Sequence, residues 1–191
     1  LSNVLVSVDE ASVKLRATDL ESEVETISSI SRFLSGGQTT VPARKFFELC
    51  RLLPDAEEVH IFLDGYSLIV EAGSGKYSLE TLQSADFPSL DIEEEKSQIN
   101  IKSTHLKELL SKTSFSIAAA DWGRPVLAGL YIAIDDIGIT AAATDASRLA
   151  IAQHSINESS TDFISAIIPK KAVNEITRLA TDINENIILE I

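Results

Sequence analysis

The stretch from Pro42 to Asp55 reads PARKFFELCRLLPD, and the stretch from Pro169 to Asp182 reads PKKAVNEITRLATD. The two align without a gap and share a proline, a glutamate, an arginine, a leucine and the final aspartate. Proline at the start favours a helix, because its missing N–H costs nothing in a first turn. Apolar residues then recur at helical spacing, which predicts amphipathic helices over 42–53 and 169–180.

A second pair of segments repeats at nearly the same spacing. The first 25 residues lie over residues 127–151 at an offset of 126, against 127 for the two helical segments. Asp9 then falls on Asp135, and Thr18 falls on Thr144. Two blocks that repeat at almost one offset predict two copies of a single domain.

The repeat predicts the domain organisation. We expect a first domain over 1–92, a second over 98–191 and a linker over 86–98. Each copy is predicted as strand, strand, helix, strand, strand, with antiparallel hairpins that keep one solvated face. The fold class is therefore α+β, with tandem domains of antiparallel sheets and helices packed on one face. The first copy has no counterpart of residues 99–126, and the second copy stops before its last strands. The sequence also contains no methionine. We therefore expect this chain to be a fragment of a longer tandem-domain protein.

Composition excludes several classes of protein. The 191 residues are 45% hydrophobic and carry a formal net charge of −13. No run approaches the roughly 18–20 apolar residues of a membrane span, and no secretory signal opens the chain. The single cysteine, Cys50, makes neither an internal disulfide nor, with three scattered histidines, a zinc motif. We therefore expect a cytoplasmic protein without a metal, and the charge taken alone argues against a nucleic-acid partner.

The basic residues nevertheless gather on predicted helices. The first helix has Arg44, Lys45 and Arg51 outside its apolar stripe, and the second has Lys170 and Lys171 facing outward. A third helix is predicted over 103–112, with Ser103 as its N-cap. Its outward basic residues are Lys107 and Lys112. These faces are either simply solvated or contact phosphates, since Lys and Arg without interleaved aromatics suit phosphate contact rather than base stacking. The expected buried stripes are Phe46, Leu49, Cys50 and Leu53; Ala172, Val173, Ile176, Leu179 and Ala180; and Leu106, Leu109 and Leu110.

No constellation in the sequence supports catalysis. The run from Gly73 to Lys76 reads GSGK, but a phosphate-binding loop needs Gly at position 70 and Ser or Thr at 77. We predict a hairpin turn there. The three histidines share no motif, and the acidic clusters at 135–136 and 91–95, which could bind a hard cation, are accounted for by a turn and a linker.

Three segments carry a resemblance to a known family. They read TTVPARKFF over 39–47, YSLETL over 77–82 followed by ADFP over 85–88, and ATDASRLA over 143–150. They closely resemble the bacterial replicative sliding clamp, the beta subunit of DNA polymerase III. The resemblance covers essentially the whole chain and implies the DNA-clamp fold, in which three domains per chain close head to tail as a homodimer ring around duplex DNA.

The resemblance also implies roles for single residues. Arg44, Lys45, Arg51, Lys170 and Lys171 match DNA-facing positions, and Lys76 lies near the edge expected to meet another subunit. One half of a peptide-binding pocket is matched by Arg124, Leu127, Thr144, Ala146, Ser147, Arg148 and Leu149. Ala146 and Ser147 replace the family's usual Gly and His there, which changes the expected shape of the pocket. Thr144 and Asp145 also fit a plain turn that holds the second hairpin, and the two roles are compatible.

The sequence thus predicts a non-enzymatic processivity factor without a cofactor. Its expected partners are double-stranded DNA, bound without sequence preference, and polymerase, clamp loader and repair proteins, bound through short peptides. The alternative is a tandem α+β interaction module whose basic helices bind an acidic protein. An enzyme that uses the acidic clusters ranks third.

Overall fold

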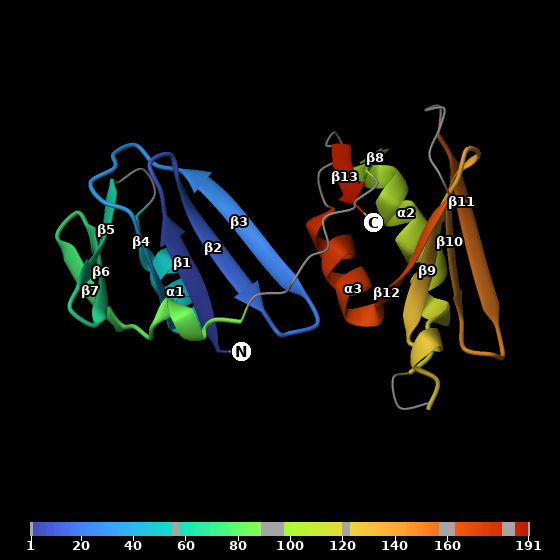
Figure 1. Ribbon diagram of the computed structural model, residues 1–191, viewed down its shortest axis with the longest axis horizontal. Helices are drawn as coiled ribbons and strands as arrows, with labels where there is room; N and C mark the ends of the chain where they lie inside the picture. Colours follow the sequence, from blue (N-terminus) through green and yellow to red (C-terminus); the bar gives the residue numbers. More distant parts are fainter. Residues whose placement is uncertain are drawn as a thin grey trace. The chain divides into compact units, whose positions relative to one another are not determined.

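The computed structural model describes residues 2–54, 58–88, 98–119, 123–156, 163–180 and 186–190. Contacts within the chain divide it into two compact units, unit 1 over Leu1–Ile92 and unit 2 over Glu93–Ile191 (Figure 1). Most of the expected linker, and the acidic cluster at 91–95, lie outside the described residues.

Among its described residues, unit 1 contains two antiparallel sheets and one α-helix. The strand order is β3-β2-β1-β4 in the first sheet and β5-β6-β7 in the second. The elements are β1 (Asn3–Val8), β2 (Ser12–Thr18), β3 (Glu23–Ser29), β4 (Gly37–Pro42), α1 (Ala43–Leu52), β5 (Val59–Asp64), β6 (Ser67–Ala72), β7 (Gly75–Glu80) and the 3₁₀ turn η1 (Ser84–Asp86).

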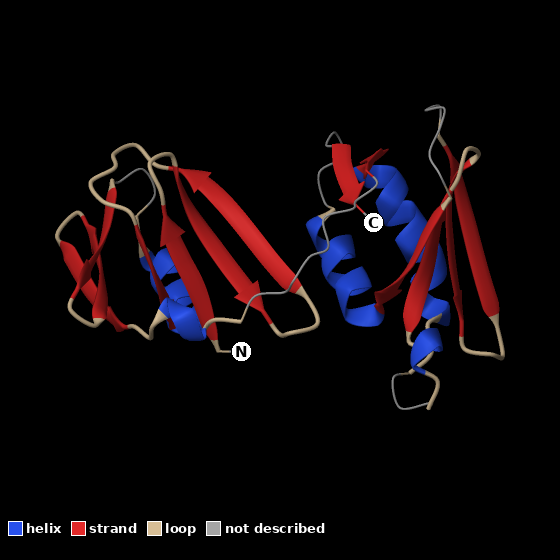
Figure 2. Ribbon diagram, in the orientation of Figure 1, coloured by secondary structure: helices blue, strands red, loops and turns tan. Residues whose placement is uncertain are grey.

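Unit 2 contains the same four-stranded sheet, in the order β11-β10-β9-β12, and a two-stranded sheet of β13 and β8. Its elements are β8 (Gln98–Lys102), α2 (Ser103–Thr113), the 3₁₀ turns η2 (Ser114–Ser116) and η3 (Pro125–Leu127), β9 (Gly129–Ile134), β10 (Gly138–Thr144), β11 (Leu149–Ser155), β12 (Ile164–Pro169), α3 (Lys170–Leu179) and β13 (Asn186–Glu190). Both α2 and α3 lie on one side of the four-stranded sheet (Figure 2).

The strand registers confirm the internal repeat and the α+β class. Val6 pairs with Leu15 in the first hairpin, and the residues 126 positions later, Ile132 and Ala141, pair in the second. Pro42 and Pro169 each end a strand directly before a helix. The run at Gly73 joins β6 to β7 as a hairpin turn, as predicted.

Alternation along the strands gives each four-stranded sheet one apolar face, and helices cover it. In unit 2 that face packs against α2 and α3 through Leu106, Leu110 and Val173, each at most 1% exposed. The core of unit 1 is smaller and is built from β1, β4, α1 and β6, with Val41 and Val70 at its centre.

Several predicted details are wrong. Two further strands stand between each hairpin and its helix, β3 and β4 in unit 1 and β11 and β12 in unit 2. Each of the two proline-led helices begins one residue later than predicted, and α2 begins at Ser103 itself, which is buried and makes no side-chain cap.

Two residues expected in the apolar stripes are exposed. Cys50 is exposed on α1, because no second helix packs beside α1 among the described residues of unit 1, whereas α2 packs against α3 in unit 2. Leu179 is 69% exposed at the last residue of α3, where the helix leaves the sheet.

The buried sheet face predicts a clear difference between two isoleucines of the same sheet. Ile132→Ala removes a side chain with no exposed surface, so we expect the free energy of unfolding to fall by about 2–5 kcal/mol. Ile151→Ala, on the opposite face and 59% exposed, serves as the control and should cost less than about 1 kcal/mol. Urea denaturation followed by circular dichroism measures both; equal losses would contradict this assignment of faces.

Candidate functional site

Helix α1 carries three predicted site residues on its exposed side. Arg44 and Lys45 lie in its first turn and Arg51 in its last, and all three are exposed. The Nε atom of Arg44 lies 3.0 Å from Glu48 Oε1, and the Arg51 guanidinium lies 5.8 Å from the Phe47 ring centroid. Contacts with such exposed partners hold the cations loosely and leave them open to a further anion.

Helix α3 presents a second cationic surface. Lys170 and Lys171 form its start and are exposed, while Arg178 near its end lies 3.3 Å from Glu175. Neither α1 nor α3 has an acidic residue in its first turn. Cations at a helix N-terminus oppose the helix dipole by a few tenths of a kcal/mol or more. Both helices therefore place positive charge in their first turn, although this position costs stability. Such an arrangement is typical of a site that binds an anion.

The turn between β10 and β11 holds most of the predicted pocket residues. Thr144 Oγ1 donates a hydrogen bond to the Arg148 carbonyl at 2.6 Å and accepts one from the Ala146 N–H at 3.1 Å. Asp145 Oδ1 accepts from the Ser147 and Arg148 N–H groups, both at 3.0 Å. The role of Thr144 and Asp145 in holding the turn is thereby confirmed.

Arg148 is positioned from two sides. Its Nε lies 2.8 Å from Asp145 Oδ2, and its guanidinium lies 5.8 Å from the ring centroid of Phe115 in η2. The pKa of Asp145 is lowered, first by the hydrogen bond from the Ser147 N–H and then by those from Arg148. Sequence reasoning missed Phe115, whose one signal is an apolar residue three positions after the end of the helix predicted over 103–112.

The remaining pocket residues lie at the same end of the sheet. Arg124 is exposed ahead of η3, and Leu127 is partly buried within it. The Leu127 carbonyl accepts a hydrogen bond from the Ala118 N–H at 3.0 Å. Because β9 begins just after η3 and runs antiparallel to β10, its start lies beside the end of β10 at Thr144. Leu149, 63% exposed, opens β11 at this end.

Unit 1 contains the same turn between β2 and β3. Thr18 Oγ1 donates to the Ser22 carbonyl at 2.9 Å and accepts from the Leu20 N–H at 3.1 Å, as Thr144 does in unit 2. Leu20 and Ala146 occupy equivalent positions, with φ of 77° and 71°. Both turns therefore hold a non-glycine residue in the left-handed region, at a cost of roughly 1–2 kcal/mol each.

Lys76 lies on β7, away from these residues in the chain. It is exposed, its Nζ lies 2.9 Å from Glu71 Oε1, and it stands 5.7 Å from the Phe62 ring centroid. Glu71 raises the pKa of Lys76, through its hydrogen bond first and its charge second.

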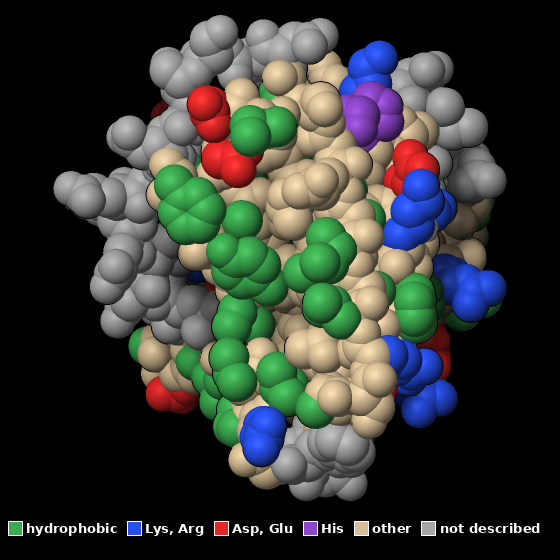
Figure 3. Space-filling view, turned by 90° about the vertical axis from the view of Figure 1, so that its right-hand side faces the viewer, with side chains coloured by type: hydrophobic (Ala, Val, Ile, Leu, Met, Phe, Trp, Pro, Cys, Tyr) green, Lys and Arg blue, Asp and Glu red, His purple; other side chains and the backbone are tan. Residues whose placement is uncertain are grey.

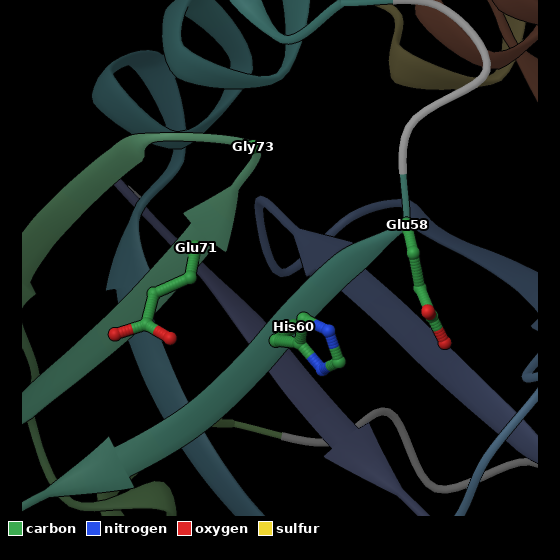
Figure 4. A pocket seen from close by; sticks show the side chains of 4 residues that line it. All are labelled: Glu58, His60, Glu71 and Gly73. Carbon is green, nitrogen blue, oxygen red and sulfur yellow. The ribbon is translucent and has the colours of Figure 1, made fainter.

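The histidines hold no metal site in the part of the chain that the structure describes. Glu58, His60 and Glu71 line a small open cavity in unit 1, where their side chains point apart (Figure 4), and no group of three or more metal-ligating side chains occurs among the described residues. His105 and His154, which share no motif, stack with ring centroids 3.7 Å apart. Desolvation, followed by the charges of His154 and Lys102, lowers the pKa of His105. No helix in the described ranges is long and apolar enough to span a membrane.

Two family models match the chain almost end to end. The N-terminal domain of the DNA polymerase III beta subunit matches residues 1–91, and its central domain matches residues 100–191. The chain belongs to the DNA polymerase III beta subunit family. Its fold, two tandem domains of antiparallel sheets with helices, is the DNA-clamp fold predicted from the sequence.

Individual members of this beta subunit family are similar to the chain in sequence and in fold. The beta sliding clamp of Proteus mirabilis is 37% identical, over 98% of this chain and 51% of its own length, and that of Vibrio cholerae is 34% identical, over 100% and 52%. A crystal structure of the DNA polymerase III subunit beta from Pseudomonas aeruginosa matches with a TM-score of 0.93 at 31% identity, over 98% of this chain and 52% of that one. The chain thus spans about half the length of these relatives.

The left-handed residue in the pocket turn yields a stability prediction. Ala146→Gly should raise the free energy of unfolding by about 0.5–1 kcal/mol, because relief of left-handed strain outweighs the greater chain entropy of glycine. Ala143→Gly, three residues earlier in β10, is the control and should lower it by about 1 kcal/mol. Thermal unfolding measures both; a loss of stability in Ala146→Gly would show that the turn is not strained.

Proposed function

We propose that this chain is part of a sliding clamp, a processivity factor that encircles duplex DNA and tethers the replicative polymerase and other clamp-binding proteins to it. The observation that carries this proposal is the pair of cationic first turns, on α1 and α3, in a protein with a net charge of −13. Family membership and the names of the relatives support the same function.

In this proposal the cations act on the phosphate backbone. Arg44, Lys45 and Arg51 of α1 and Lys170 and Lys171 of α3 would meet phosphates that carry no sequence information. Long exposed side chains, some of them already paired with carboxylates, make loose contacts without a preferred register. A ring held in this way can slide.

A ring closed around the duplex explains how an acidic protein can remain on DNA. A closed ring keeps its cargo at high effective concentration without needing tight affinity for the duplex. The function is non-enzymatic in this proposal, needs no cofactor, and belongs in the cytoplasm beside the replication machinery.

The pocket at the end of the β9–β12 sheet would receive short peptides of polymerase, clamp loader and repair proteins. Leu127 and Leu149 would form apolar walls, and Thr144, Arg124 and Arg148 would anchor the peptide. Ala146 and Ser147, in the turn between β10 and β11, would shape the base of the pocket. The exposed positions of Leu149 and Arg148 support this role.

The same proposal extends to assembly. We propose domains over 1–92 and 98–191 joined by a linker over 86–98, in a protein that closes as a homodimer with Lys76 near the subunit edge. In unit 2, β8 pairs with β13, whereas β5, the counterpart of β13, has no partner on its outer side among the described residues. A cleft of about 660 Å³ lies beside β5, and a strand and helix of the β8–α2 kind would fill both positions in the first domain.

Charge reversal tests the DNA contact. Lys170→Glu/Lys171→Glu should weaken binding to a short duplex about tenfold or more at low salt and reduce the slope of log affinity against log salt by about 2, because two phosphate contacts are lost. Fluorescence anisotropy of the labelled duplex measures both quantities. Lys14→Glu/Lys102→Glu is the matched control, with the same charge change on β2 and β8, and should remain within about twofold of the unaltered protein at the same ionic strength.

The result also separates the proposed clamp from a module that binds an acidic protein. A clamp keeps its affinity for a polymerase-derived peptide in the Lys170→Glu/Lys171→Glu variant, since the peptide occupies the pocket. Equal weakening of DNA binding in both variants would refute specific contact by α3.

A further inference from the structure

In the proposed pocket, the guanidinium of Arg148 is held by two neighbours. Its Nε donates a hydrogen bond to Asp145 Oδ2 at 2.8 Å, and its central carbon lies over the Phe115 ring, 5.8 Å from the ring centroid. A cation within about 6 Å of a ring centroid is attracted to the face of the ring. The two contacts use Nε and one side of the guanidinium, so the N–H groups of Nη1 and Nη2 are the donors that these contacts leave for another acceptor.

Unit 1 shows that the turn itself needs neither contact. Asp19 Oδ1 accepts hydrogen bonds from the Glu21 and Ser22 N–H groups, at 3.1 and 2.8 Å, as Asp145 Oδ1 does from the equivalent N–H groups of unit 2. Ser22 stands where unit 2 has Arg148, and the turn forms with serine at that position. The contact between the guanidinium and the ring is therefore an addition to the shared turn, and folding of the turn does not account for it.

The Phe115 ring stands on a rigid support. Phe115 is the middle residue of η2, which begins directly after α2. Thr113 and Ser116, on either side of it, are fully buried, and Thr113 Oγ1 donates a hydrogen bond to the Leu109 carbonyl at 2.7 Å. The buried neighbours fix the backbone at Phe115. The side chain itself is 60% exposed and adds little to the core, so its contact with Arg148 is what distinguishes it.

A guanidinium that is held before binding gives a higher affinity. Hydrophobic side chains cover the middle of the unit 2 face drawn in Figure 3, and basic side chains lie toward its edge. Apolar neighbours offer a guanidinium no hydrogen-bond acceptor that could orient it. Arginine also has a large rotamer entropy, part of which is lost when a ligand fixes the side chain. Because the ring already restricts Arg148, less of this freedom is lost when a peptide binds.

We propose that Phe115 is a positioning residue of the peptide pocket: its ring holds the Arg148 guanidinium so that Nη1 and Nη2 donate to an oxygen of the bound peptide. This inference rests on the proposed function, since it needs a peptide at this turn. The acceptor is a carbonyl or carboxylate oxygen, which the planar guanidinium can bind through two N–H groups. The ring acts through the arginine and does not itself contact the peptide.

A double-mutant cycle in the complete protein tests this coupling. The probe is a fluorescently labelled peptide that carries only the clamp-binding motif of the replicative polymerase subunit from the same organism, and anisotropy measures its affinity. We expect Phe115→Leu to weaken binding about threefold, the size of an exposed cation–π contact, and Arg148→Gln to weaken it about tenfold. Phe115→Leu/Arg148→Gln should bind no more weakly than Arg148→Gln alone, because the ring then has no guanidinium to hold.

Two further variants separate positioning from a structural role. Phe115→Tyr keeps the ring, and should bind the peptide as the unaltered protein does. Phe47→Leu is the matched control, because Phe47 of α1 makes the same contact with Arg51, also at 5.8 Å, and is exposed to the same degree, at 61%. We expect its affinity for the peptide to be unchanged.

The outcomes are distinguishable. Unchanged affinity in Phe115→Leu overturns the positioning role, and so does an equal loss in Phe115→Tyr. A loss from Phe115→Leu that persists in the Arg148→Gln background overturns it as well, because the ring would then contact the peptide directly. Failure of the peptide to bind the unaltered complete protein overturns the proposed function of the pocket, and this inference with it.

Discussion

Each four-stranded sheet has one apolar face that must be removed from water, and the rest of the molecule follows from that requirement. In unit 2 the face is covered by α2 and α3, whose buried residues include Leu110 and Val173. A helix that packs in this way turns its other side outward. The sheet therefore determines which residues of α3 are exposed, and Lys170 and Lys171 are among them.

The duplication lets one unit serve as the control for the other. Thr18 and Thr144 make the same hydrogen bonds in equivalent turns, so those bonds belong to the shared fold. Arg148 has no charged counterpart, since Ser22 occupies that position in unit 1. Features that differ between copies on an identical framework are the ones for which function, rather than folding, is the natural explanation.

Much of this architecture could be predicted from the sequence, because hairpins and amphipathic helices are local patterns. Strand β3 was missed: it lies at the sheet edge and every residue after Glu23 is exposed, so no clear apolar alternation marks it. The approach of Phe115 to Arg148 and the stack of His105 on His154 join residues far apart in the chain. The left-handed backbone conformation of Ala146 could not be predicted either, because alanine does not favour that conformation. Such contacts depend on how the elements pack, which spacing along the chain does not encode.

The central claim is that the complete protein stays on DNA because it encloses the duplex, and not because it binds the surface of the duplex tightly. The most direct measurement follows the complete protein after a clamp loader has placed it on nicked circular DNA, before and after one restriction cut. An enclosing ring stays on the circle through gel filtration at moderate salt, and leaves once the DNA has ends. Equal retention on circular and linear DNA, or equal loss from both, would contradict enclosure and point to ordinary surface binding.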